Sequence, residues 1–79
     1  MLDFRIETFL MVCQYMNYTK AAEALNITQP AVSQHIRYLE EEYHAKLFLQ
    51  EGKRIQLTEE GELFRQTALR IQHDVLHLK

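Results

Sequence analysis

One stretch decides the fold of this chain of 79 residues, Thr28-Gln29-Pro30-Ala31-Val32-Ser33-Gln34-His35-Ile36-Arg37-Tyr38-Leu39-Glu40. Thr28 can cap the first free amides of a helix, and Pro30 falls in the first turn, where its missing N–H costs nothing. The apolar side chains then recur at helical spacing: Val32, Ile36, Leu39 and Tyr43. The sequence therefore predicts an amphipathic helix over about residues 28–42.

The opposite face of this helix carries amide, hydroxyl and guanidinium groups, the types that hydrogen-bond to base edges and phosphates. Its residues are Gln29, Pro30, Ser33, Gln34, Arg37 and Tyr38. An ordinary surface helix carries a lattice of Glu and Lys, but no acidic residue occurs here between Glu23 and Glu40. We interpret the stretch as a DNA recognition helix; the alternative is a solvated helix face.

The composition is that of one small, helix-rich domain, with 47% hydrophobic residues, two Gly and one Pro. No apolar run approaches the roughly 20 residues that span a bilayer, and no signal peptide is evident. The single Cys13 excludes an internal disulfide and is interpreted as a small apolar side chain. We therefore expect a cytoplasmic protein without membrane contact.

The net charge of −2 argues against nucleic-acid binding, but its distribution weakens that objection. Residues 43–58 hold Lys46, Lys53 and Arg54 against the single acid Glu51, whereas acids gather at 40–42 and 59–62. A locally basic surface on an acidic domain is sufficient for binding DNA, with modest non-specific affinity.

Two shorter helices are expected before residue 28. Asp3 can cap a first helix that runs to about Met16, and Thr19 can cap a second from Lys20 to about Asn26. The small Ala21 and Ala22, together with Leu25, face inward and allow close approach of a neighbouring helix. Asn26 tolerates positive φ and can replace the usual turn glycine. This arrangement predicts a helix-turn-helix.

After Tyr43 the apolar period changes from that of a helix to that of strands. Four apolar residues, Leu47, Leu49, Ile55 and Leu57, alternate with Phe48, Gln50, Arg54 and Gln56. Glu51-Gly52-Lys53 is the expected turn, so the pattern predicts a β-hairpin, the wing of a winged helix-turn-helix. The apolar set is expected to pack on the helices and on itself.

Thr58 can cap a last helix, whose first-turn acids suit the positive end of the helix dipole. Its apolar residues recur at steps of 4, 3, 4 and 3: Phe64, Ala68, Ile71, Val75 and Leu78. Such a heptad seam predicts a homodimer through this helix. The alternative is a terminal helix that folds entirely onto its own domain.

Three segments together resemble the N-terminal winged helix-turn-helix domain of LysR-type transcriptional regulators. They are Tyr18-Thr19-Lys20-Ala21-Ala22-Glu23-Ala24-Leu25; Thr28-Gln29-Pro30-Ala31-Val32-Ser33 with Ile36 and Leu39-Glu40; and Lys46-Leu47-Phe48 with Leu57-Thr58-Glu59-Glu60-Gly61. The resemblance covers essentially the whole chain, in order and at the usual spacing. The predicted fold class is therefore mainly α: three helices, a two-stranded β wing and a long C-terminal linker helix.

The resemblance implies a division into a DNA-binding domain, residues 1–58, and a linker and dimerisation helix, residues 59–79. It implies a homodimer whose recognition helices enter successive major grooves of an interrupted inverted repeat in double-stranded DNA, with the wing, residues 50–54, on the backbone or minor groove. The expected DNA-binding residues are Thr19, Lys20, Thr28, Gln29, Pro30, Ser33, Gln34, Arg37, Lys53 and Arg54. A small-molecule effector would bind a further domain that is absent here, and the helical character at Leu78-Lys79 leads us to expect a piece of a longer regulator.

The sequence departs from the family pattern at the wing and on the recognition helix. Tyr43-His44-Ala45 replaces the usual Leu-Gly, and Gln50 and Lys53 stand where arginine is common. Gln34 also stands where arginine is frequent in the family, so the family's base preference at that position does not carry over to this chain. Arg37 is expected to bind phosphate, with an ion pair to Glu41 as the competing use.

Other functions receive little support from the sequence. We expect no enzyme activity and no cofactor, because no nucleophile–base pair, Gly-rich phosphate loop or metal cluster is evident. His73 and His77 have a spacing that can hold a metal but lack a third ligand, so a solvated face is expected. The main alternative to DNA binding is a winged-helix protein-interaction module.

Overall fold

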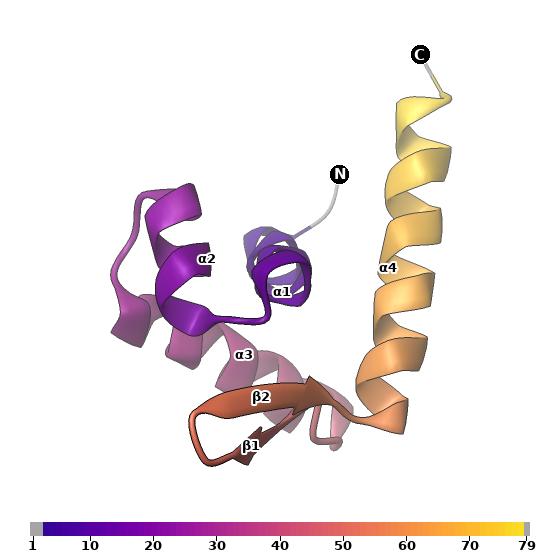
Figure 1. The fold of residues 1–79 in the computed structure, drawn as a ribbon. Coiled ribbons are helices and arrows are strands. Elements are labelled where there is room, and N and C mark those ends of the chain that lie inside the picture. Colours follow the sequence, from indigo (N-terminus) through magenta and orange to yellow (C-terminus); the bar gives the residue numbers. More distant parts are fainter. Residues whose placement is uncertain (1–2, 79) are drawn as a thin grey trace.

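The computed structural model describes residues 3–78, so the first two residues and Lys79 of the predicted division lie outside the described part. Its elements are α1 (Phe4–Tyr15), α2 (Tyr18–Leu25), α3 (Gln29–Tyr43), β1 (Phe48–Glu51), β2 (Arg54–Leu57) and α4 (Glu59–Leu76). Figure 1 shows the first three helices packed together, the hairpin beneath them, and α4 standing along one side. The predicted winged helix-turn-helix with a long last helix is confirmed.

Local capping chemistry sets the start of α1 and α3. The Asp3 carboxylate accepts a hydrogen bond of 2.7 Å from the amide of Arg5. The Thr28 hydroxyl accepts one of 3.2 Å from the amide of Ala31. Both caps were predicted, because a short polar side chain just before an apolar helical pattern satisfies one of the free amides of the first turn.

The predicted cap of α2 was wrong by two residues. Asn17, in extended backbone with φ −162°, is the N-cap, and its side chain accepts from the amide of Lys20 at 2.8 Å. Thr19 already lies inside the helix. Asparagine caps at least as well as threonine, so the earlier of the two candidates begins the helix.

The turn between α2 and α3 depends on Asn26, whose φ is +59°, as expected for its role in place of glycine. Ala21 is 0% exposed and Ala22 is 4% exposed, which lets α1 and α3 approach α2 closely. The core then joins residues from α1, α2, α3 and the first strand: Phe9, Val12, Ala21, Ala22, Val32, Ile36, Leu39, Leu47 and Phe48.

The hairpin has the predicted turn, with Gly52 at φ +59°, but its inward face differs from the prediction. Phe48 pairs with Leu57 across the antiparallel strands and is buried, whereas Leu49 is 51% exposed. The Phe48 ring lies 5.4 Å from the ring of Phe9. Leu47 is buried just before the strand begins, so the alternation starts at Phe48 and Leu49 faces outward.

A set of hydrogen bonds joins α3, the wing and α4. The Glu40 carboxylate on α3 accepts from the amide of Leu47 at 2.8 Å and forms an ion pair of 3.8 Å with Lys46. The Leu47 carbonyl accepts from the amide of Thr58 at 3.0 Å. The Thr58 hydroxyl, the predicted cap of α4, accepts from the amide of Gly61 at 2.8 Å.

The predicted seam on α4 is divided between the core and the surface. The Phe64 ring lies 5.0 Å from that of Phe9, and Ala68 is 4% exposed, so both pack within this chain. Ile71 is 44% exposed, Val75 is half-buried, and Leu78 lies beyond the last helical residue. The first half of α4 therefore belongs to the domain core, and the second half extends past it (Figure 1).

Candidate nucleic-acid interface

The recognition helix presents its polar face outward, as the sequence predicts. Val32, Ile36 and Leu39 are at most 3% exposed and fix the inward side of α3. The predicted contact residues lie on the opposite side: Gln29, Pro30, Gln34 and Arg37 are exposed and Ser33 is half-buried. Tyr43, expected on the apolar face, is the last residue of α3 and is 53% exposed. One side of its ring still packs against Phe64.

Two predicted base readers contact each other at the start of α3. The Gln29 side-chain amide donates a hydrogen bond of 3.3 Å to the Ser33 hydroxyl, one helical turn away. This bond limits the rotation of the carboxamide while leaving its oxygen and its second N–H free. A carboxamide with one free acceptor and one free donor side by side matches the N6 and N7 edge of adenine.

The wing and the start of α2 meet the start of α3 at one polar hollow. Four predicted contact residues line it, Thr19, Gln29, Ser33 and Lys53. Gln50, which stands where an arginine is common in the family, also lines the hollow and donates to the Gly52 carbonyl at 2.8 Å. The Gln50 side chain therefore braces the wing turn, a role that the sequence did not reveal.

The start of α2 offers one lysine side chain and two backbone amides. The Asn17 side chain accepts a hydrogen bond from the Lys20 amide, and the Lys20 side chain is exposed. The amides of Tyr18 and Thr19 precede it in the first turn, where helix N–H groups have no partner within the helix. Such amides beside a lysine suit a phosphate oxygen.

The two predicted contact arginines, Arg37 and Arg54, lie outside the hollow. Arg54 is on the outer strand face, paired in register with Glu51. Arg37 lies beside another surface depression, together with Glu41 and His44. The ion pairs among residues 3–78 do not include Arg37 with Glu41, so the competing use of this guanidinium is not observed in the described part of the chain.

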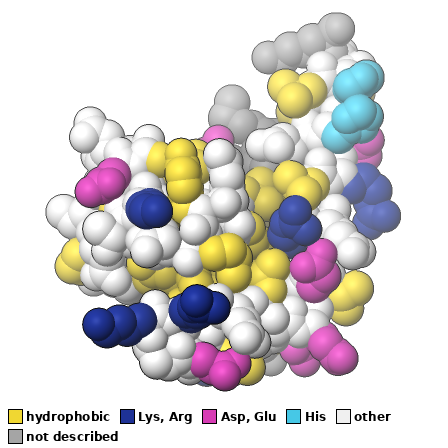
Figure 2. All heavy atoms as spheres, in the orientation of Figure 1, with side chains coloured by type: hydrophobic (Ala, Val, Ile, Leu, Met, Phe, Trp, Pro, Cys, Tyr) yellow, Lys and Arg dark blue, Asp and Glu magenta, His cyan; other side chains and the backbone are white. Residues whose placement is uncertain are grey.

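Cationic and acidic side chains are mixed on the surface. Figure 2 shows cationic side chains over the hairpin and over α2, with acidic side chains near them, and further acidic side chains where α4 begins. The acids in that first turn are Glu59, Glu60 and Glu62. The first half of α3 itself carries no acid, whereas Glu40, Glu41 and Glu42 follow in its second half.

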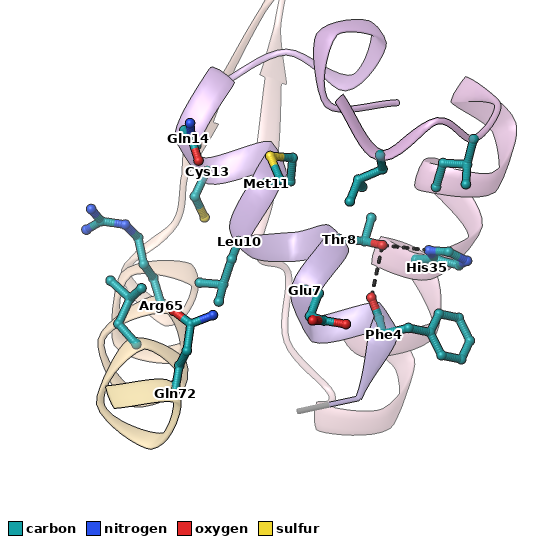
Figure 3. A pocket seen from close by; sticks show the side chains of 13 residues that line it. Phe4, Glu7, Thr8, Leu10, Met11, Cys13, Gln14, His35, Arg65 and Gln72 are labelled. Atoms are coloured by element: carbon teal, nitrogen blue, oxygen red, sulfur yellow. Dashed lines mark hydrogen bonds between the residues drawn. The ribbon is translucent and has the colours of Figure 1, made fainter. Parts of the chain in front are cut away.

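Sequence analysis missed how α1 supports the recognition helix. Thr8, 3% exposed on α1, donates to the Phe4 carbonyl at 3.1 Å and lies 2.9 Å from Nδ1 of His35 on α3 (Figure 3). Since the single hydroxyl proton of Thr8 is used by Phe4, His35 Nδ1 is the donor in the neutral ring. Burial and the nearby Arg5 charge lower the pKa of His35, against the opposing effect of Asp3.

Arg5 was also missed, because a single basic residue near a helix start carries no periodic signal. Its guanidinium carbon lies 3.9 Å from the ring centroid of Tyr38, across 33 residues of sequence. Only the folded chain brings these two side chains together.

The other hollows do not suggest catalysis. A pocket between α1 and α4 is lined by Cys13 and Arg65, among others (Figure 3). Burial raises the pKa of the Cys13 thiol to about 12, so the reactive thiolate is strongly disfavoured. Within residues 3–78 no three potential ligands gather at a metal site, and the rings of His73 and His77 lie 4.0 Å apart on α4. No helix in that range is long and apolar enough to cross a membrane.

Comparison with protein families gives a match over most of the chain. The model described as "Bacterial regulatory helix-turn-helix protein, lysR family" matches residues 5–62. The transcriptional regulator CitR of Bacillus subtilis is 43% identical over 74 residues, which are 92% of this chain and 25% of CitR. The chain therefore spans about a quarter of the length of that relative.

Solved structures give the same picture. A LysR-family transcriptional regulator from Eggerthella lenta is 63% identical, with a TM-score of 0.79 over 85% of this chain and 96% of that one. The BenM_DBD in its catB site 1 DNA complex is 32% identical, with a TM-score of 0.90 over 99% of this chain and 84% of that one. The CbnR_DBD in its DNA complex is 26% identical, with a TM-score of 0.89 over 98% and 88%.

Proposed function

The chain belongs to the lysR family of bacterial regulatory helix-turn-helix proteins, and from this membership we propose that it binds double-stranded DNA sequence-specifically to regulate transcription. One observation carries the proposal. Over residues 29–38 the outer face of α3 presents amides, a hydroxyl and a guanidinium without an acid, and the hydrogen bond from Gln29 to Ser33 orients a base-reading carboxamide at its start.

The side chains divide into two roles on the DNA. Gln29 and Gln34 read base edges in the major groove, Ser33 positions Gln29, and Pro30 offers an apolar contact to a thymine methyl. The other predicted contact residues bind the backbone: Thr19, Lys20, Thr28, Arg37, Lys53 and Arg54. Phosphate contacts fix the register in which the readers meet the bases.

The second part of the proposal is a homodimer joined through α4. Ile71, in the half of α4 that extends past the domain body, is 44% exposed, and Leu78, beyond the last residue of α4, is 84% exposed. Since Phe64 and Ala68 already pack within the chain, the dimer contact lies in the second half of the predicted seam. The pair of domains, residues 1–58, would then bind an interrupted inverted repeat in double-stranded DNA.

Sedimentation tests the dimer. The wild-type chain is expected to be a dimer at micromolar concentration, and Ile71→Asp should shift it to the monomer because the charge cannot be buried in the seam. Gln66→Asp changes an exposed position of the same helix and is the matched control. A monomeric wild-type chain would contradict the seam without affecting the DNA-binding proposal.

A salt titration tests DNA binding against the alternative, a winged-helix protein-interaction module. Sequences are first selected from a random duplex pool, and the affinity for the selected duplex is then measured as the salt concentration rises. Four phosphate-binding cations per protomer, Lys20, Arg37, Lys53 and Arg54, predict a log–log slope of about −3.6 for each bound protomer. Failure to enrich any duplex, or an affinity independent of salt, would favour the interaction module.

A further inference from the structure

The N-terminal turn of α1 is fastened to the side of the recognition helix. Phe4 meets His35 edge to face, with ring centroids 5.0 Å apart, and Thr8 contacts the same imidazole at 2.9 Å (Figure 3). The guanidinium carbon of Arg5 lies 3.9 Å from the ring centroid of Tyr38 and 4.6 Å from that of Phe4. Arg5 therefore lies over Tyr38 of α3 and over the ring of its own neighbour on α1, Phe4.

The position of Tyr38 places Arg5 beside the reading face. Tyr38 lies one helical turn after Gln34, so the two side chains are neighbours on the surface of α3. The opposite edge of that face faces the wing, because Gln29 and Ser33 line a hollow with Lys53. Arg5 and the wing thus lie on the two flanks of the reading face.

The guanidinium of Arg5 keeps most of its donors. Its only ion pair within residues 3–78 is with Asp3, a single N–H contact of 3.4 Å. The Asp3 carboxylate is 46% exposed and is already engaged as the helix cap, so it competes weakly. A guanidinium has five N–H groups in its plane, and stacking on Tyr38 occupies a face while leaving that edge open.

We propose that Arg5, held on Tyr38, is a further backbone contact of this domain and binds a DNA phosphate on the flank of α3 opposite the wing. This inference rests on the proposed DNA binding. Arg5 adds a cation on the flank of α3 away from Lys53 and Arg54 of the wing. Contacts on both flanks would clamp the recognition helix in the major groove, which a wing contact alone would leave free to tilt.

The test is the salt dependence of binding to the selected duplex. With Arg5 as a fifth cation the wild-type log–log slope is about −4.5 for each bound protomer, and Arg5→Gln is expected to return it to about −3.6. Because of this change of about 0.9 in the slope, the variant gains about eightfold less affinity per protomer than the wild type when the salt is lowered from 1 M to 0.1 M. The loss should be the same for all sequences, because a phosphate contact carries no base information. Arg5→Lys keeps the charge and is expected to retain the slope.

Arg70→Gln is the matched control, because it removes the same charge from an exposed position on α4. It should leave the slope close to that of the wild type. Arg5→Met, which keeps an apolar stem against the rings, replaces Arg5→Gln if that variant does not fold. An unchanged slope in folded Arg5→Gln or Arg5→Met would reduce Arg5 to a structural brace and overturn the inference. A wild-type chain that binds no duplex would instead overturn the proposed function and this inference together.

Discussion

Gly61 is the residue whose substitution tests the junction between the wing and α4 most directly. A Cβ atom on Gly61 would lie 2.2 Å from the Leu47 carbonyl oxygen and 2.8 Å from Cδ2 of Leu57. The first of these is a backbone atom and cannot rotate away, so Gly61→Ala forces α4 to move off the wing. Overpacking of this kind costs about 1–3 kcal/mol.

Two smaller effects modify that cost. The Leu47 carbonyl also accepts from the Thr58 amide, and displacing it weakens a hydrogen bond worth about 0.5–1.5 kcal/mol. Alanine is favoured over glycine inside a helix by about 1 kcal/mol, which offsets the lost hydrogen bond. The net expectation for Gly61→Ala is a loss of about 1–3 kcal/mol in the free energy of unfolding.

Urea and thermal unfolding measure this loss, with a decrease in Tm of about 4–8 °C for each kcal/mol in a domain of this size. The scans are run at several protein concentrations, because a dimer makes Tm concentration-dependent. Gln66→Ala introduces the same residue at an exposed position of α4 and should stay within about 0.5 kcal/mol of the wild type. Equal or greater stability of Gly61→Ala would refute the close approach of α4 to Leu47.

Three further predictions test the hairpin register, the α1–α3 contact and the reading face. Phe48→Ala should destabilise the fold by about 3–5 kcal/mol and Leu49→Ala by less than about 1 kcal/mol. The reverse order in urea unfolding would mean that Leu49 faces the core, as the sequence pattern predicted. Because the folded-state pKa of His35 is lowered, the neutral imidazole contributes stability above pH 6.5, and this contribution is lost as the pH falls. The difference in unfolding free energy between wild type and His35→Asn should therefore shrink from about pH 7.5 to about pH 5. A difference that grows over this range would contradict the lowered pKa. Gln29→Ala should cost about 1–3 kcal/mol of discrimination at one base pair, whereas Lys53→Ala should weaken all duplexes alike; uniform losses from both in competition binding would remove Gln29 as a reader.

The features that sequence predicted best depend on neighbouring residues alone. The caps at Asp3, Thr28 and Thr58 and the positive φ of Asn26 follow from short-range geometry, which each residue type either permits or does not. The amphipathic face of α3 follows in the same way from the spacing of its apolar residues. The outward placement of Gln29 is a consequence of that spacing.

The features that the sequence did not predict depend on a choice between neighbouring residues of similar type, or on contacts between residues distant in the sequence. Asn17 and Thr19 could both cap α2, and composition did not decide between them. Leu47, Phe48 and Leu49 are three consecutive apolar residues, so no period indicates which of them faces the core. The inward packing of Phe64 depends on Phe9 and Tyr43 in other helices.

The junction between α3, the wing and α4 connects the two halves of the proposed function. Glu40 on the recognition helix holds the Leu47 amide, and the Leu47 carbonyl holds Thr58, the cap of α4. In a dimer joined through α4, the direction of this helix relative to α3 sets the distance between the two recognition helices. That distance must match successive major grooves, about 34 Å apart. A movement of α4 at Gly61 would therefore change the spacing of the two reading faces in such a dimer, as well as the stability of each domain. The junction would then preorganise the proposed dimer for a repeat of fixed spacing.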